Sequence, residues 1–492
     1  MSETPPFPLS RIVIVGDTLA GWMSAAMLSR MLGGAAKIAL CPERAQPTIA
    51  GALASLPSLG EFHGFLGVDE RDLVRFCRAT FRLGTLWRDW PHAGADFVDD
   101  FGETGAPVDG VAFHHAWTRA RRAGASSAYD RFSLGARAGR LGRFQHPSTD
   151  PRDIRASYRY GLHLDAQLYA DYMRRYAIHY GVETTAPLAD VEIAAGRIGA
   201  LTAKDGARLA ADLYLDCSGP AAILLDRLDS GGWRDFSGAP ALDRIAWRMA
   251  DGAAALSLTD YRAGDIGWRS VAPLQDSRCE TQAFASSATD DETARAAFGA
   301  GNGAVEFAPI RRRRRAPWAG NVVAVGDAAC ELDPLASPSL RIAEAGLTTL
   351  RGLLPATHGD CGERDEYNRI MENAFERLHD FQTLHYARSP AAWAAGAAPS
   401  PHLLRKIEQF ESRGRLVQYD EESVAPENWI SCLLGHGVIP GRSDPLLDPA
   451  PDDMVKAKLD AMMRAVDDAA KAMPDQLDYL TRAGAVKPER RR

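Results

Sequence analysis

The stretch RIVIVGDTLAG, residues 11–21, decides the fold of this chain. The short β-branched run Arg11–Val15 ends at a glycine, and residues 20–32 then have a helix-forming composition. This order predicts a strand, a tight turn and a helix. Residues 37–40 supply the next strand. The predicted unit is therefore β-α-β, which opens a Rossmann-type dinucleotide-binding sheet.

The turn carries most of a nucleotide-binding motif. Gly16, Thr18 and Gly21 occupy the three glycine positions of G-x-G-x-x-G between that strand and that helix. Thr18 stands where the middle glycine normally lets the backbone contact a pyrophosphate, and Asp17 adds negative charge near the helix N-terminus. The motif favours dinucleotide binding. The alternative is a β-α-β unit that kept its fold and weakened or lost the nucleotide.

Two later strands support the same sheet. Residues 212–216 and 321–325 are apolar runs that each end at a turn, the second at Gly326 and Asp327. Parallel strands would bring both ends to one rim of the sheet. A Gly-Asp pair between a strand and a helix is typical of flavin monooxygenases, where it contacts the ribityl and phosphate groups. The alternative is an aspartate that only caps the turn.

The length, composition and net charge of the chain narrow the class of protein to which it can belong. The chain has 492 residues, 46% of them hydrophobic, and a net charge of −7 from dispersed charges. These values exclude one small domain and give no reason to expect nucleic acid or a membrane as partner. Seven scattered cysteines without a C-x-x-C pair, and the absence of a signal-peptide pattern, favour a reduced cytoplasmic setting and no metal site. We expect residues 1–390 to form a sheet domain and residues 391–492 a helical C-terminal module.

The combined pattern resembles the flavin-dependent tryptophan halogenases, within the flavin monooxygenase superfamily. The segments that carry the resemblance occur in family order: IVIVGDTLAGWMSAA (12–26), PTI (47–49), ATFRL (79–83), LHLDA (162–166), DCSG (216–219), WAGN (318–321) and WISCLLGHGVIP (429–440). The resemblance implies a flavin-monooxygenase-like α/β fold and FAD that a separate flavin reductase reduces. It also implies dioxygen, a halide and a small aromatic substrate. The cofactor-binding residues expected from it are Gly16, Thr18, Gly21, Gly326, Asp327 and Ser337.

Four departures from the family pattern affect the chemistry. Arg82 stands at the position of the family lysine, and it stays protonated and is not a nucleophilic amine. Ala336 replaces the family glutamate, and Pro338 and Ser339 replace the threonine and glycine of the halide site. The W-x-W-x-I-P signature reads WRSVAP at Trp268–Pro273. The flavin-contacting strap reads AGALAS at residues 50–55, without the family's glutamate.

These observations leave two hypotheses. The first is an FAD-dependent monooxygenase-type oxidoreductase that acts on an aromatic or indole-like substrate and is not a lysine-dependent halogenase, with Arg82 as a doubtful catalytic residue. The second is a non-catalytic relative that serves as a binding or regulatory partner. Whether a homodimer or a partner chain completes the site stays open.

Other residues could also take part. His163, His379 and His385 are candidate general bases, with structural histidines as the alternative. The run Arg311 to Arg315 is interpreted as a solvated edge or a partner-facing patch, with one or two arginines meeting an acidic substrate as the alternative.

Overall fold

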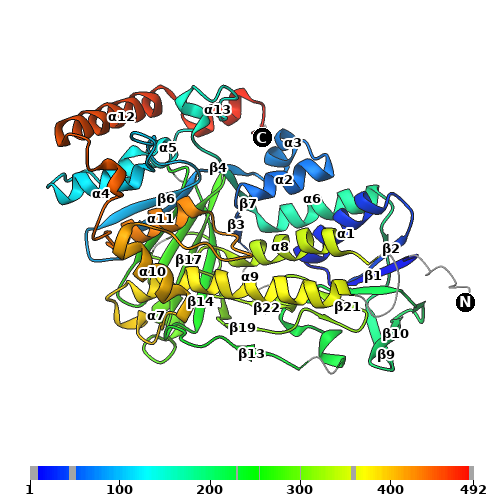
Figure 1. Ribbon diagram of the computed structural model, residues 1–492. Coiled ribbons are helices and arrows are strands. Elements are labelled where there is room, and N and C mark those ends of the chain that lie inside the picture. The colour runs from blue at the N-terminus through cyan, green and yellow to red at the C-terminus, as the bar shows by residue number, and fades with distance from the viewer. Residues whose placement is uncertain are drawn as a thin grey trace, which may run out of the picture.

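The computed structural model describes residues 9–43, 51–228, 231–253, 255–299, 301–355 and 362–486. The resemblance segment 47–49, strap residue Ala50 and Cys361 lie outside these ranges. Figure 1 shows the Rossmann-type sheet with β1 and β2 at one end of the molecule and long antiparallel strands toward the other. Helices α8 and α9 run between them.

The predicted dinucleotide-binding sheet is present. Its strands are, in spatial order, β20 (Trp318–Ala319), β21 (Val322–Ala324), β12 (Leu213–Asp216), β1 (Arg11–Val15), β2 (Lys37–Cys41) and β8 (Glu183–Thr184). β1 pairs in parallel with β2 and β12, and β12 pairs in parallel with β21. Val15 is level with Asp216, and Asp216 with Ala324. The carboxyl ends of these strands therefore meet at one rim, as the sequence predicted.

A larger sheet forms the second layer. It is mostly antiparallel and runs β18 (Glu306–Pro309), β14 (Arg244–Asp251), β17 (Ser277–Phe284), β16 (Trp268–Pro273), β15 (Thr259–Ala263), β5 (Gly84–Arg88) and β6 (Asp96–Asp100). Trp268 is fully buried here, and its indole Nε1 donates a hydrogen bond to the Tyr386 hydroxyl at 2.9 Å. Trp268, the tryptophan that remains of the W-x-W-x-I-P signature, therefore joins this sheet to α9.

A three-stranded sheet lies between the two layers and carries Arg82. It consists of β3 (Ala52–Ala54), β7 (Gly161–Asp165) and β4 (Thr80–Arg82), all antiparallel. The remaining strands form two more three-stranded sheets: β11 (Arg208–Leu209), β10 (Arg197–Ala203) and β9 (Leu188–Ala194), and β13 (Arg234–Asp235), β19 (Arg313–Arg314) and β22 (Cys330–Glu331).

Helices cover both sheets. They are α1 (Leu19–Leu32), α2 (Ser58–Leu66), α3 (Glu70–Phe76), α4 (Phe113–Arg122), α5 (Leu134–Arg140), α6 (Ala166–His179), α7 (Asp291–Ala296), α8 (Pro338–Leu353), α9 (Gly362–Ala387), α10 (Pro401–Arg413), α11 (Pro426–Gly435), α12 (Asp452–Ala472) and α13 (Gln476–Arg482). The last four lie in the region expected to form a C-terminal module, and α12 packs beside α4 and α5 (Figure 1). A separate module boundary at residue 390 stays a prediction.

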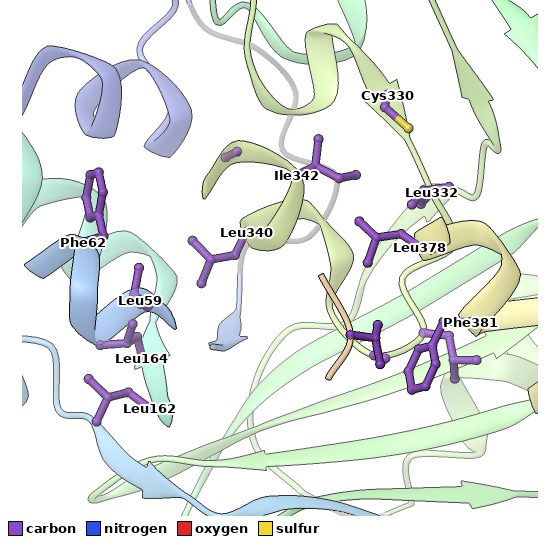
Figure 2. Packing of buried hydrophobic residues seen from close by; sticks show 14 of the residues in the cluster. Leu59, Phe62, Leu162, Leu164, Cys330, Leu332, Leu340, Ile342, Leu378 and Phe381 are labelled. Atoms are coloured by element: carbon purple, nitrogen blue, oxygen red, sulfur yellow. The ribbon is translucent and has the colours of Figure 1, made fainter. Parts of the chain in front are cut away.

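The packing of α8 brings the layers together. Figure 2 shows Leu340 of α8 between Leu59 and Phe62 of α2 and Leu378 and Phe381 of α9. All five are buried in one hydrophobic cluster. The six cysteines in the described ranges are buried and free of disulfides. No helix in these ranges is long and apolar enough to cross a membrane.

Candidate functional site

The turn after β1 has the geometry of a nucleotide-binding loop. Gly16 has φ 132°, and a Cβ there would lie 2.2 Å from the carbonyl oxygen of Cys217. A Cβ on Gly21 would lie 2.2 Å from the carbonyl oxygen of Gly16. Both positions therefore require glycine, because no side chain fits.

Thr18 points into the protein. Its hydroxyl donates to the carbonyl oxygen of Cys217 at 2.8 Å and accepts from the backbone N–H of Gly21 at 3.1 Å. Thr18 is thus the N-cap of α1, a position that favours threonine. Its side-chain oxygen is therefore bonded within the fold, and the effect of Thr18 on a bound nucleotide stays a prediction.

The Gly-Asp turn lies beside this loop. Gly326 and Asp327 begin the 3₁₀ turn Gly326–Ala328 after β21. Gly326 has φ 70°, and a Cβ there would lie 3.1 Å from the Cβ of Ala20 on α1. Two glycine-lined turns and the N-terminus of α1 thus meet at one rim. This cradle fits the pyrophosphate and ribityl parts of FAD.

The start of α8 is strained. Ala336 (φ 60°) and Ser337 (φ 53°) are consecutive residues in the left-handed region, which non-glycine residues rarely adopt. The N–H of Ala336 donates to the Tyr261 hydroxyl at 3.0 Å, and the N–H of Ser337 to the carbonyl oxygen of Pro334 at 3.1 Å. Pro338 then occupies the first turn of the helix. The N–H groups of Ala336, at the family glutamate position, and of Ser337 are therefore bonded within the protein, and Pro338, at a halide position, has no N–H to donate.

Arg82 is locked in place. Its guanidinium donates to the Thr259 hydroxyl at 2.8 Å, the Ser55 carbonyl at 2.8 Å and the Thr85 hydroxyl at 2.7 Å. It also lies over the ring of Phe101, 4.8 Å from the centroid. Complete burial, and secondarily the charge of Arg341, lower its pKa to about 9. Arg82 holds three segments together and is not among the residues that line the cavity described next.

A cavity of about 1200 Å³ opens beside Arg82. Its outer walls carry exposed side chains such as Glu61, Glu103 and Glu427. Its inner residues are buried: Leu59, Asp99, Phe101, Leu162, Arg341, Phe381 and Asn428. The cavity thus runs from the surface to the neighbourhood of α8, and Figure 2 shows Leu59, Leu162 and Phe381 on opposite sides of that helix.

Charged groups lie at the inner end. Asp99 precedes Asp100, the last residue of β6, and its carboxylate accepts a hydrogen bond from the Asn428 amide at 2.5 Å. Burial raises the pKa of Asp99 to about 6, although the hydrogen bond from Asn428 and the charges of Arg341 and Arg82 oppose that rise. Burial lowers the pKa of Arg341, with Asp99 opposing the change. The cavity therefore combines an apolar wall with a buried carboxyl group and a buried guanidinium.

The candidate histidines do not line this cavity. His163 is fully buried between the hydroxyls of Thr80 (3.2 Å) and Thr259 (2.9 Å). His385 stacks on Trp87 with ring centroids 3.8 Å apart and contacts His436 at 2.8 Å between ring nitrogens. Burial lowers the pKa of His379 to about 4. The structural alternative is favoured for all three.

The interpretation of the arginine run as a solvated or partner-facing patch is wrong. Arg312 pairs with Asp333, Arg313 with Glu331 and Arg315 with Asp226. Arg314 pairs with Glu372 at 2.6 Å and Glu376 at 2.5 Å. Arg312 to Arg315 are instead held by acidic residues from several distant segments, which the sequence of the run alone does not show, whereas Arg311 is exposed.

Sequence reasoning missed Asp99, Arg341 and Asn428. A signal existed for two of them: the stretch FVDD ends in adjacent carboxylates, although it was not predicted as a strand, and LRIAEAG places a lone arginine within an apolar helix face. Their convergence depends on contacts between β6, α8 and α11, which the local pattern does not contain.

Comparison with known proteins agrees with this architecture. The family model for tryptophan halogenase matches residues 11–452. The tryptophan 6-halogenase ThaL of Streptomyces albogriseolus is 28% identical over 423 residues, which cover 78% of this chain and 77% of that protein. The structure of BrvH, a flavin-dependent halogenase from Brevundimonas sp. BAL3, superposes with a TM-score of 0.91 and 30% identity. That superposition covers 97% of this chain and 99% of BrvH.

A flavin-dependent halogenase from Xanthomonas campestris gives a TM-score of 0.90 at 28% identity and covers the same shares of both chains. The resemblance carried by the glycine loop and the late tryptophan-glycine segment is thus confirmed over nearly the whole chain. The chain belongs to the tryptophan halogenase family.

Proposed function

We propose that the protein is a flavin-dependent oxidoreductase that oxidises an aromatic or indole-like substrate in the cavity beside α8, without lysine-dependent halogenation. The observation that carries this proposal is Arg82. The guanidinium takes the lysine position, is fixed by three hydrogen bonds and contributes no nucleophilic amine. Family membership supports FAD as the cofactor and an aromatic substrate.

Different residues of this chain would bind the cofactor, exclude water from the substrate and accept a proton. Gly16, Gly21, Gly326 and the N-terminus of α1 would hold FAD; Thr18 caps α1, Asp327 lies in the turn with Gly326, and Ser337 precedes α8. Reduced FAD, when bound there, would supply the activation of dioxygen that the oxidation of the substrate requires. The buried wall of Phe101 and Phe381 excludes water from the ring that is to be oxidised. Asp99, with its pKa near 6, is placed to accept a proton at its carboxylate.

Two measurements test the proposal. Purified protein should be yellow, or should retain added FAD after desalting, as seen in its visible absorption spectrum. With a flavin reductase, dioxygen and an indole, mass spectrometry should find an oxygenated product whether or not bromide is present. Brominated or chlorinated tryptophan that depends on Arg82 would contradict the proposal.

A non-catalytic role is not favoured, because the glycine cradle and the cavity are both present. We further propose a cytoplasmic setting and supply of reduced flavin by a separate reductase. The six buried, free cysteines support a reducing compartment. A homodimer stays a prediction, for which the mass in solution is the test.

A further inference from the structure

Arg341 on α8 is a buried guanidinium that forms no hydrogen bond or ion pair with the residues that the structure describes. Its side chain lines the cavity and is 9% exposed. Its Nε has no hydrogen-bond acceptor, and no residue in the described ranges forms an ion pair with it within 4.0 Å. Arg377 also has buried nitrogens without a hydrogen bond, but it forms an ion pair with Asp380 at 3.9 Å, as Arg312 does with Asp333 and Arg248 with Glu280. Because an unpaired buried charge is costly, this arrangement points to a ligand.

The neighbouring carboxyls do not supply that partner. Asp99 directs one oxygen to the Asn428 amide, and Glu344 lies one helical turn after Arg341. Burial raises the pKa of Glu344 to about 7 and that of Asp99 to about 6. Burial therefore favours the neutral, protonated form of both carboxyl groups. Arg82 adds a second buried cation nearby. The inner end of the cavity is therefore short of negative charge.

We propose that Arg341 binds the carboxylate of an aromatic acid in this cavity. A planar carboxylate matches the donors of a guanidinium in two parallel hydrogen bonds. The apolar wall of Leu59, Leu162, Phe101 and Phe381 receives the ring. The cavity, at about 1200 Å³, exceeds the upper end of ordinary ligand sites, roughly 1000 Å³, so it admits a substituted or extended aromatic. This inference rests on the proposed function and specifies its substrate class.

The test is equilibrium binding to the full chain by isothermal titration calorimetry, with indole-3-acetate and its neutral counterpart indole-3-acetamide as probes. We expect the acetate to bind about tenfold tighter or more, since a charge-assisted bidentate pair distinguishes the two. Arg341→Gln should reduce acetate affinity to that of the amide and leave amide affinity unchanged. Arg341→Lys should restore part of the preference, because it keeps the charge. Arg351→Gln, an exposed arginine on the same helix, is the matched control.

Thermal unfolding separates a ligand-binding role from a structural one. Arg341→Gln should unfold at the same or a higher temperature than the unaltered chain, because it removes an unpaired buried charge. Three results would overturn the proposal: equal affinity for the two probes, no binding of either, or equal loss of both in Arg341→Gln. Preferential, Arg341-dependent binding of sodium bromide would also overturn it in favour of a halide site. Since this test adds neither flavin nor reductase and measures no turnover, its failure leaves the FAD spectrum and the product assay unaffected.

Discussion

Arg82 and Arg341 are buried cations in the same part of the fold, but they are held differently. Arg82 gives its hydrogen bonds to three neutral oxygens, whereas Arg341 gives its Nε–H to none in the described ranges. A guanidinium whose hydrogen bonds join three segments has a structural role. A guanidinium that lines a cavity and has no such bonds can bind a ligand. The arginine at the lysine position is therefore the less promising of the two for chemistry.

Restoring the family lysine tests this distinction. Arg82→Lys should lower the free energy of unfolding by about 2 kcal/mol, because one ammonium cannot reach Thr259, Ser55 and Thr85 together. It should produce no halogenated indole, since Ala336 supplies no carboxylate. Denaturant unfolding and mass spectrometry of products with bromide check the two parts. A stable variant that brominates indole would contradict this account.

Asp100 should make stability depend on pH. Burial raises its pKa to about 8, against the hydrogen bond that the Ser133 hydroxyl donates to it. Because the folded chain binds the proton of Asp100 more tightly than the unfolded chain does, the protonated carboxyl contributes to the free energy of unfolding. That contribution is complete below the pKa of the unfolded chain, about 4, and is lost as pH rises through the folded pKa of about 8. Asp100→Asn should therefore gain stability relative to the unaltered chain, by up to about 1.4 kcal/mol per pH unit across that window. Melting curves at several pH values that stay parallel would refute this.

The strand-turn-helix after β1 shows why a local pattern can predict a fold. The alternation of a β-branched run, glycines and a helix-forming stretch is a local pattern, so the sequence predicts these elements even though β1 pairs with β12 and Gly16 packs on Cys217. The predicted β-α-β unit and the parallel strands ending at Asp216 and Ala324 are confirmed on that basis. Thr18 was harder to interpret, because its cap also depends on a carbonyl at Cys217, about two hundred residues away.

Gly16 provides the sharpest test of this turn. Gly16→Ala would place a Cβ 2.2 Å from a backbone oxygen and force alanine to φ 132°. We expect a loss of about 3 kcal/mol or more in the free energy of unfolding and no retention of FAD after desalting. Gly60→Ala in α2 is the matched control, because nothing lies within 4 Å of its Cβ position. That change should be neutral or stabilising by up to about 1 kcal/mol.

Thr18 itself should matter for stability more than for the nucleotide. Thr18→Gly, which restores the motif glycine, removes the cap of α1 and should cost no more than about 1 kcal/mol. FAD affinity should change less than it does in Gly16→Ala. A large gain in FAD affinity, measured by fluorescence titration, would show that Thr18 obstructs the cofactor.

The cavity is a property of the entire chain, and it could not be predicted from the sequence. Its walls come from segments as distant as Leu59 on α2, Asp99 on β6, Asn428 on α11 and Val466 on α12. The internal arginine run is a similar case, because its acidic partners come from residues 226 to 376. Such sites arise where separate elements pack, and periodicity within one element contains no information about its distant neighbours.

The contribution of α12 to the cavity leads to a final prediction. Ala465 lines the cavity from α12 and is exposed, so an indole ring placed there would occupy the mouth. Ala465→Trp should raise KM for the aromatic substrate about tenfold and leave FAD retention unchanged, because the nucleotide rim lies on the other sheet. Ala461→Trp, on the same helix but not lining the cavity, should change neither. Equal effects of the two substitutions on KM would mean that α12 acts only through stability, and that the substrate reaches α8 by another route.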